Sequence, residues 1–282
     1  MRVLFILVAA ALIFLVGLYF FSRRLLYFPV PVTPERLAYI KTSIPGVAEI
    51  QIPVENKVVL HGWFLKKDLA RLPTIFYFGG NAEEVSLNLE EYAAKLSANV
   101  VLMNYRGYGR STGSPAENHL KSDALAIYDY MADQLGLDPK KCVAWGRSIG
   151  SSMAACLALK RDLGRLILTC PFDSIQNVAA AYYPAWLVNL VLQDRHRTID
   201  FSADIQSSTL VLASMEDGVI PSHNTQKLFD SLTCPKKMVY IPGAGHNTIS
   251  MFDAYYENIN RFLNKDPGPV KLLEQPGSVK SF

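Results

Sequence analysis

The segment Gly146-Arg147-Ser148-Ile149-Gly150 holds the residues of this chain that are best placed for covalent chemistry. An apolar run precedes it and a run of small residues follows it, which predicts a strand, a sharp turn and a helix. A Gly-x-Ser-x-Gly turn in this position lifts the serine hydroxyl clear of a sheet. Both glycines are needed, because a side chain there would collide with the neighbouring helix and strand. We therefore predict that Ser148 is a nucleophile.

A serine hydroxyl needs a base within hydrogen-bond reach, and the chain has five histidines. His246 lies in a glycine-rich loop directly after the strand-like run 237–241, where it could swing over a nucleophile. The other four lie in a strand-like run, in an amphipathic helix, in a polar stretch and at a helix start: His61, His119, His196 and His223. We predict that His246 is the base.

The base in turn needs a carboxylate that fixes its tautomer, expected between the serine and the histidine in the chain. Glu216 and Asp217 follow the strand-like run 209–214, at the end of a strand where open α/β sheets place their functional loops. We favour Asp217, because the phrase Asp-x-x-Ile-Pro continues into a helix start. Asp173, after the strand-like run 166–170, is a rival that we expect to cap the turn 171–174 instead.

Acyl transfer also needs hydrogen-bond donors for the negative charge that develops on the attacked oxygen. One expected donor is the backbone N–H of Ile149, directly after the predicted nucleophile. The other is expected in the loop 79–82, where glycines let the backbone approach a ligand and a helix begins. We assign it to the backbone N–H of Asn81, or to that of Ala82 one residue on. Gly80 and Ala82 are also expected to contact the substrate.

The elements that must position these residues follow a regular order. The strand-like runs 49–54 and 58–65 are joined at residues 55–57, which predicts a hairpin. From residue 74 strands and helices alternate, which predicts an α/β fold with a mostly parallel sheet and helices on both faces. The expected segments are 74–78, 84–97, 100–104, 117–135, 141–145, 149–159 and 166–170.

With these residues in place the chain resembles the α/β-hydrolase superfamily, and more closely the membrane-anchored serine hydrolases that have one N-terminal transmembrane helix. The resemblance covers residues 50–263 and implies the α/β-hydrolase fold. It rests on the paired loops of Asp217 and His246 and on four phrases: Leu60-His61-Gly62-Trp63-Phe64, Phe78-Gly79-Gly80-Asn81-Ala82, Asn104-Tyr105-Arg106-Gly107-Tyr108-Gly109 and Gly146-Arg147-Ser148-Ile149-Gly150. Gly79 stands where this family usually has histidine, and Asn104 where it usually has aspartate.

Residues 176–206 interrupt the alternation. They contain two apolar stretches, 178–183 and 186–192, with Pro184 between them. In the resembled family this part of the chain commonly forms a small cap over the site, which would face an acyl chain or a membrane and bring Trp186 to the substrate. The alternative is a pair of helices packed in the core, and the sequence leaves both interpretations open.

Residues 3–21 form an uninterrupted apolar run of 19 residues at the N-terminus. As a helix this run would be about 28 Å long, close to the ~30 Å of a bilayer core. Arg23 and Arg24 close it, and no small-residue cleavage phrase follows. We predict an uncleaved anchor at residues 1–24 rather than a cleaved signal peptide. The basic residues on its two sides balance, so the orientation of the span stays open.

The rest of the chain is expected to contain a linker at 25–46, one domain at 47–265 with the cap-like insertion, and a flexible tail at 266–282. The net charge of +3 is too small to argue for nucleic acid. The four cysteines have neither metal-ligand nor disulfide-framework spacing, and the Gly79 loop lacks the ending of a phosphate loop. We therefore expect neither a metal nor another cofactor. The oligomeric state stays open.

These features together predict a membrane-anchored serine hydrolase that uses Ser148, Asp217 and His246. The expected partner is a small-molecule, lipid or acyl substrate with a carboxylic ester or thioester bond, since such a bond suits a site held at a bilayer. An aminopeptidase-like amidase is an alternative, because the same three residues cleave amides. A non-catalytic scaffold with the hydrolase fold is the alternative outside enzymes.

Overall fold

The domain is built on one sheet of eight strands, and the computed structural model describes residues 1–264. The strands are β1 (Val47–Pro53), β2 (Val59–Leu65), β3 (Thr74–Phe78), β4 (Asn99–Met103), β5 (Cys142–Arg147), β6 (Arg165–Thr169), β7 (Ser208–Ser214) and β8 (Lys236–Ile241). The helices are α1 (Arg2–Leu26), α2 (Pro34–Ser43), α3 (Leu89–Lys95), α4 (Glu117–Leu135), α5 (Gly150–Lys160), α6 (Ile175–Ala180), α7 (Ala185–Val191), α8 (Ser222–Ser231) and α9 (Asp253–Asn264).

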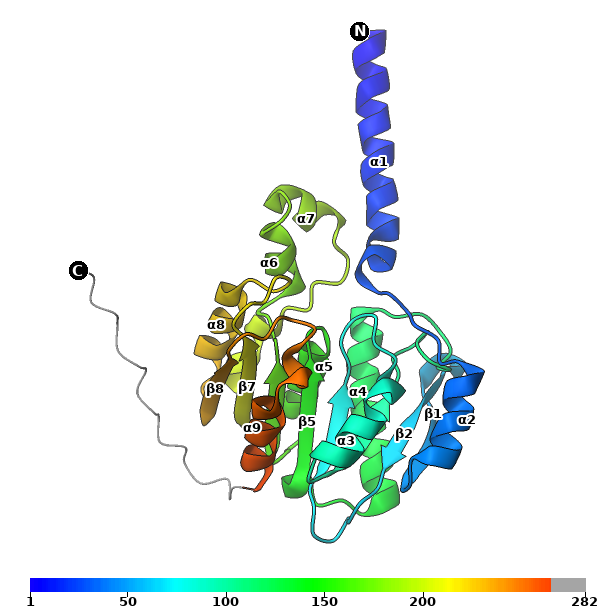
Figure 1. Ribbon diagram of the computed structural model, residues 1–282. Coiled ribbons are helices and arrows are strands. Elements are labelled where there is room, and N and C mark those ends of the chain that lie inside the picture. Colours follow the sequence, from blue (N-terminus) through cyan, green and yellow to red (C-terminus); the bar gives the residue numbers. More distant parts are fainter. Residues whose placement is uncertain (265–282) are drawn as a thin grey trace, which may run out of the picture.

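The sheet has the strand order β1-β2-β4-β3-β5-β6-β7-β8. The pairs β1–β2 and β2–β4 are antiparallel, and all other neighbouring pairs are parallel. Helices lie on both sides of the sheet, and α1 projects away from the domain (Figure 1). The predicted α/β fold with a mostly parallel sheet is therefore confirmed, and each predicted strand lies within two residues of its expected position.

Each central strand supplies side chains to two separate cores, because successive side chains point to opposite faces of a sheet. In β3, Phe76 and Phe78 pack with residues of α4 and α5, whereas Ile75 and Tyr77 pack with residues of α3 and α9. All four side chains are buried. Burial on both faces explains why the parallel strands are continuous apolar runs in the sequence.

The helix expected at 84–97 is divided in two. A 3-10 helix covers Val85–Asn88, and α3 follows it. The cause lies in Glu84, whose buried carboxylate accepts a hydrogen bond from the backbone N–H of Ser86 and another from the amide of Asn104. These bonds hold the first turn in a tighter conformation than an α-helix.

The segment expected as a linker, 25–46, contains the helix α2. Pro34 occupies its first turn, and the side chain of Thr33 accepts a hydrogen bond from the backbone N–H of Arg36. Ile40 and Ile44 are buried in the core that lies under α3 and α9. The segment is therefore part of the domain. The tail expected at 266–282 lies outside the described residues.

Among the described residues α1 is the one helix long and apolar enough to cross a membrane, a property that signal sequences share. Its base is attached to the domain. The Arg23 guanidinium pairs with the Asp194 carboxylate at 3.1 Å, and the Gln193 amide donates to the Tyr19 carbonyl at 2.6 Å. Ser22 is buried at the same place. The last turns of α1 therefore have specific partners more than a hundred residues away.

A second attachment lies just after α1. The hydroxyl of Tyr27 and the Nε2 atom of His196 are 2.9 Å apart, and both side chains are buried. Burial lowers the pKa of His196 from 6.5 to about 4, although the nearby Glu117 carboxylate opposes this shift. His196 is therefore neutral in the folded protein near neutral pH.

This burial predicts acid destabilisation. Between pH 6.5 and about 4 the unfolded chain binds a proton at His196 that the folded protein does not, so the free energy of unfolding falls as the pH falls. The expected loss is about 3 kcal/mol across that window. Denaturant unfolding in detergent at several pH values measures it. The variant His196→Asn is suitable for the comparison, because asparagine tolerates the left-handed backbone at this position. Its free energy of unfolding should fall by about 3 kcal/mol less over the same pH range. If the pH dependence is the same as in the wild type, His196 is not the group responsible.

Candidate active site

Four loops meet at one edge of the sheet and carry the predicted site residues. They follow β3, β5, β7 and β8, which are parallel and whose carboxyl ends therefore lie together. The loops supply Asn81, Ser148, Asp217 and His246 respectively. Positions separated by up to 165 residues in the sequence are thus brought to one place by strand order alone.

Ser148 lies in a sharp turn between β5 and α5. Its φ angle is 52°, in the left-handed region that only a few residue types adopt readily. The turn is held by a 2.8 Å hydrogen bond from the Ser148 backbone N–H to the Thr169 carbonyl on β6. A strained backbone of this kind at a turn between a strand and a helix is typical of a nucleophile elbow.

The two glycines of the motif permit the close packing that the sequence predicts. A Cβ atom on Gly150 would lie 2.1 Å from the Phe78 carbonyl oxygen, and one on Gly146 would lie 2.2 Å from the Gly150 carbonyl oxygen. Both neighbours are backbone atoms, so neither can rotate away. Because these two positions have no side chain, α5 packs directly against the backbone of β3 and β5.

This packing predicts that Gly150→Ala destabilises the domain by about 3 kcal/mol, because the added methyl group overlaps the backbone of β3. The shift in thermal unfolding measures the effect. Gly218→Ala is a matched control, since no atom lies within 4 Å of the methyl group it adds. Equal stabilities for the two variants would refute the packing argument.

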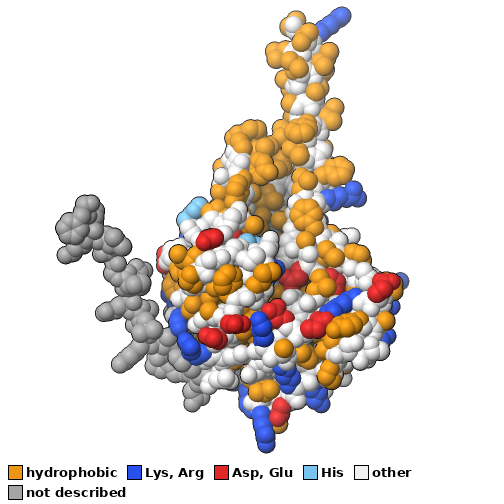
Figure 2. Space-filling view, viewed as in Figure 1, with side chains coloured by type: hydrophobic (Ala, Val, Ile, Leu, Met, Phe, Trp, Pro, Cys, Tyr) orange, Lys and Arg blue, Asp and Glu red, His pale blue; other side chains and the backbone are white. Residues whose placement is uncertain are grey.

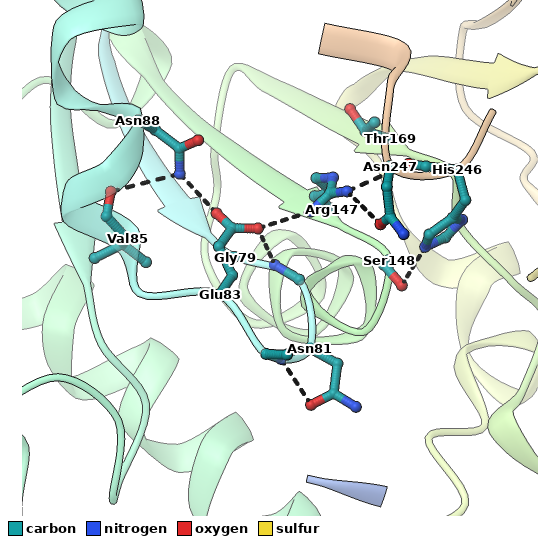
Figure 3. A network of polar contacts seen from close by, with 12 residues as sticks. Gly79, Asn81, Glu83, Val85, Asn88, Arg147, Ser148, Thr169, His246 and Asn247 are labelled. Carbon is teal, nitrogen blue, oxygen red and sulfur yellow. Dashed lines mark hydrogen bonds and ion pairs between the residues drawn. The ribbon is translucent and has the colours of Figure 1, made fainter. Parts of the chain in front are cut away.

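The structure brings Ser148, His246 and Asp217 into one hydrogen-bonded chain. The Nε2 atom of His246 lies 3.0 Å from the Oγ atom of Ser148, and its Nδ1 atom lies 2.8 Å from Oδ2 of Asp217. Figure 3 shows His246 directed at the Ser148 hydroxyl. These are the distances that proton transfer from a serine to an oriented histidine requires.

Asp217 is held in place on both sides. Its Oδ1 atom accepts hydrogen bonds from the backbone N–H groups of Val219 and Ile220, at 2.9 and 2.8 Å, while Oδ2 faces His246. Burial alone would raise the pKa of Asp217. The hydrogen bonds from His246 and from the two backbone groups outweigh burial and lower that pKa below its ordinary value. The side chain is therefore a carboxylate near neutral pH.

Neither rival carboxylate reaches His246. Glu216 is exposed, and its backbone N–H donates to the Ala244 carbonyl. The buried Asp173 carboxylate instead accepts a hydrogen bond from Asn224 at 2.8 Å and pairs with Lys227 at 3.2 Å. Asp173 thus holds the start of the cap against α8. The geometry favours Asp217 among the three.

The predicted donors for a negatively charged oxygen differ in availability. Among the described residues, the backbone N–H groups of Ile149 and Asn81 have no acceptor. The N–H of Ala82 donates to the Asn81 side chain at 3.0 Å, and the N–H of Gly80 donates to Glu83 at 2.7 Å. The N–H groups of Ala82 and Gly80 therefore already have acceptors, and the N–H group of Asn81 fits the donor role better than that of Ala82.

The Asn81 side chain is fixed by three residues from two other parts of the chain. Its amide nitrogen donates to the carbonyl of Leu26, at the end of α1. Its oxygen accepts from the backbone N–H of Phe28 at 3.1 Å and from the hydroxyl of Tyr108 at 3.0 Å. The loop that holds the candidate donor is thus bound directly to the segment that follows α1.

Sequence reasoning missed an ion pair that joins three of the four loops. The Arg147 guanidinium pairs with Glu83 at 2.9 Å and donates to Asn247 Oδ1 at 3.0 Å and to the His246 carbonyl at 3.3 Å (Figure 3). Glu83 also accepts from Gly80. Arg147 lies inside the Gly-x-Ser-x-Gly motif, but its variable position in that motif carries no signal for this role.

A buried cysteine, Cys170, lies beside Asp217 and His246. It follows β6 directly, and its sulfur lies within 4.8 Å of ligand atoms of Asp217 and His246. Burial and the nearby Asp217 charge raise the pKa of its thiol to about 12, so the side chain is an uncharged thiol near neutral pH. Because Asp217 and His246 hydrogen-bond directly to each other, the cluster does not fit a metal ion well.

The interrupted region 176–206 forms a cap of two short helices, α6 and α7, above the same edge of the sheet (Figure 1). Val188 is the buried residue of α7, so the alternative of two core helices is wrong. Tyr182 connects the cap to the acid loop, because its hydroxyl donates to the Val219 carbonyl at 3.2 Å. Trp186 lies on α7 with 64% of its surface exposed, and it is not part of the hydrogen-bonded group of Ser148, His246 and Asp217.

The fold and these loops define an α/β-hydrolase. The family described as "alpha/beta hydrolase fold" matches residues 58–199, and the chain belongs to this family. An uncharacterised protein of Mycobacterium tuberculosis is 30% identical over 249 residues, which cover 86% of this chain and 88% of the relative. The alpha/beta hydrolase domain-containing protein WAV2 of Arabidopsis thaliana is 29% identical over 91% of this chain and 92% of its own.

Solved structures agree on the fold. An esterase of Pyrococcus furiosus superposes with a TM-score of 0.65 at 18% identity, over 84% of this chain and 98% of its own. An alpha-beta hydrolase of Vibrio vulnificus superposes with a TM-score of 0.64 at 17% identity, over 89% of this chain and 90% of its own. At these identities the likeness shows the shared architecture alone.

Proposed function

We propose that this protein is a membrane-anchored serine hydrolase that cleaves a carboxylic ester or thioester. One observation carries the proposal: the His246 imidazole lies within hydrogen-bond distance of both the Ser148 hydroxyl, at 3.0 Å, and the Asp217 carboxylate, at 2.8 Å. Four further features support it: the left-handed φ of Ser148, the N–H groups of Ile149 and Asn81 that find no acceptor within residues 1–264, the lowered pKa of Asp217 and the membership in the α/β-hydrolase family.

The chemistry proceeds in two steps. The Ser148 oxygen attacks the carbonyl carbon of the substrate while its proton passes to Nε2 of His246. The N–H groups of Ile149 and Asn81 stabilise the oxyanion, and Asp217 stabilises the imidazolium. His246 then gives the proton to the leaving alcohol or thiol, and the acyl group stays on Ser148. Water, deprotonated by His246, attacks this acyl-enzyme and releases the carboxylic acid, and the proton returns to Ser148.

The proposed anchor is α1, retained rather than cleaved as a signal sequence. Two observations support its retention. Ser22 and Tyr27 are buried against the domain, and Arg23 pairs with the buried carboxylate of Asp194. Cleavage before the domain would remove the hydrogen-bond partners that Asp194 and His196, both buried in the intact protein, have in this segment. A signal peptide is removed from the mature protein, so contacts of this kind would not contribute to the stability of the mature domain.

The substrate bond follows from the site and the anchor together. A site held at a bilayer meets lipids and acylated proteins, and many of their acyl groups are joined by esters or thioesters. An alcohol or a thiol leaves a tetrahedral intermediate more readily than an amine does. The proposal therefore places esters and thioesters ahead of amides.

The test compares p-nitrophenyl acyl esters, acyl thioesters and aminoacyl anilides with the full-length protein in detergent. Turnover of the esters or thioesters, with little turnover of the anilides, is expected. Faster turnover of the anilides would assign the protein as an amidase. If a fluorophosphonate probe fails to label the protein and no substrate turns over, the chain is a scaffold and the proposal fails.

A further inference from the structure

The cap exposes several large apolar and aromatic side chains. No charged residue lies between Asp173 and Asp194 in the sequence. Four large apolar or aromatic side chains of the cap are exposed by 53–64%, namely Tyr182, Tyr183, Trp186 and Leu190. Soluble monomers rarely expose a contiguous apolar patch of this kind without a partner for it. The cap surface therefore needs a cover that accepts apolar side chains and no charge.

The cap lies beside α1, and two contacts between them fix their relative position along the axis of α1. The Gln193 amide is bound to the carbonyl of Tyr19, and Asp194 is paired with Arg23. α7 packs against α1 above these contacts. The charged residues Arg23 and Asp194 are thus at the same height. Beyond them no further charged residue occurs in the cap before Asp173, or in α1 before Arg2. Figure 2 shows hydrophobic side chains over both the cap and the adjoining part of α1.

We infer that the cap, residues 178–192, inserts into the lipid leaflet that adjoins the domain. The inference rests on the proposed anchor. If the part of α1 from Phe21 toward the N-terminus crosses the bilayer, the cap beside it lies at bilayer depth. The lipid accounts for the absence of charge, and Tyr182, Tyr183 and Trp186 are the side chains that favour a membrane interface. The occupant of the cap surface is therefore lipid.

This placement also specifies how the substrate arrives. The acid loop is attached to the cap through the Tyr182–Val219 hydrogen bond. The loop of Asn81 is attached to the base of α1 through Leu26 and Phe28. The two sides of the site are thus tied to two elements that both meet lipid. The substrate class is an acylated amphiphile that stays in the leaflet while its carbonyl group reaches Ser148.

Tryptophan fluorescence tests the insertion directly. Trp63 and Trp145 are 1% and 0% exposed, so Trp186 is the tryptophan that responds to its surroundings. The full-length protein is reconstituted in phosphatidylcholine vesicles whose lipids carry bromine near the headgroup or near the chain end. We expect quenching, stronger for bromine near the headgroup, in wild type. Trp186→Phe, which retains only the two core tryptophans, should lose that quenching.

The outcomes separate this inference from the proposed function. Vesicle flotation reports the anchor, and hydrolysis of a water-soluble ester reports the site. A protein that floats and hydrolyses the ester, but whose Trp186 emission is unaffected by brominated lipid, overturns the insertion and leaves the proposed function intact. Trp186 emission that is unquenched yet protected from water would instead assign a second copy or another protein as the cover.

Kinetics provide the second measurement. Leu190→Lys places a charge on the inserted surface, and we expect KM for a long-chain ester carried in vesicles to rise about tenfold. Turnover of a short water-soluble ester should stay unchanged. Tyr130→Lys on α4 is the matched control, since Tyr130 is an exposed aromatic residue far along the helix from the cap. Equal KM values for the two variants would contradict the inference.

Discussion

Replacing Ser148 by alanine should lower kcat for ester hydrolysis by about 10⁶-fold. The variant has no oxygen to attack the carbonyl carbon, and no acyl-enzyme can form. The donors at Ile149 and Asn81 stay in place, so a small residual rate above the uncatalysed reaction is expected. Steady-state hydrolysis of a p-nitrophenyl ester, together with fluorophosphonate labelling, measures the loss.

Ser152→Ala is the control for this variant. Ser152 lies on α5, it is fully buried, and among the described residues its hydroxyl has no hydrogen-bond partner. The same loss of a hydroxyl there should leave both kcat and labelling near the wild-type values. A Ser148→Ala protein that still reacts covalently with the probe would show that the nucleophile lies elsewhere.

The Asp217→Asn variant should lower kcat by about 10⁴-fold, with little change in stability. The amide oxygen can still accept from the N–H groups of Val219 and Ile220, so the loop keeps its shape. The amide nitrogen would face Nδ1 of His246, which favours the tautomer with its proton on Nε2. That tautomer cannot take the proton of Ser148. Single-turnover kinetics should show that acylation is the step that slows.

The neighbouring carboxylate provides the comparison. Glu216→Gln removes one charge from the same loop, but the side chain is exposed and the backbone bond to Ala244 is retained. We expect kcat close to the wild-type value. If Glu216→Gln slows hydrolysis more than Asp217→Asn does, the assignment of the acid is wrong.

The sequence predicted the elements that follow from local pattern. The strands around Ser148 and Asp217 are apolar runs of the right length, and the elbow is specified by two glycines within five residues. Chain order then predicted which loops would meet. The loop of His246 could be placed because it follows a strand-like run that aligns with β8.

The sequence could not predict contacts that depend on three-dimensional proximity. Glu83 and Arg147 are 64 residues apart, and nothing local indicates that they pair. The same holds for the choice between Asn81 and Ala82, which depends on where the Asn81 amide turns. The helix α2 was missed for another reason: its few apolar residues produce a weak pattern, and packing on the edge of the sheet decides its conformation.

The junction after α1 has a practical consequence for work with shortened proteins. A fragment that begins at residue 29 would lack the Tyr27 hydroxyl, the Leu26 carbonyl and the Phe28 N–H. The imidazole of His196 would then lose the one hydrogen bond that its ring makes within the described residues, and the Asn81 amide would lose two of its partners. Such a soluble fragment should be less stable and slower than the intact enzyme even towards substrates dissolved in water.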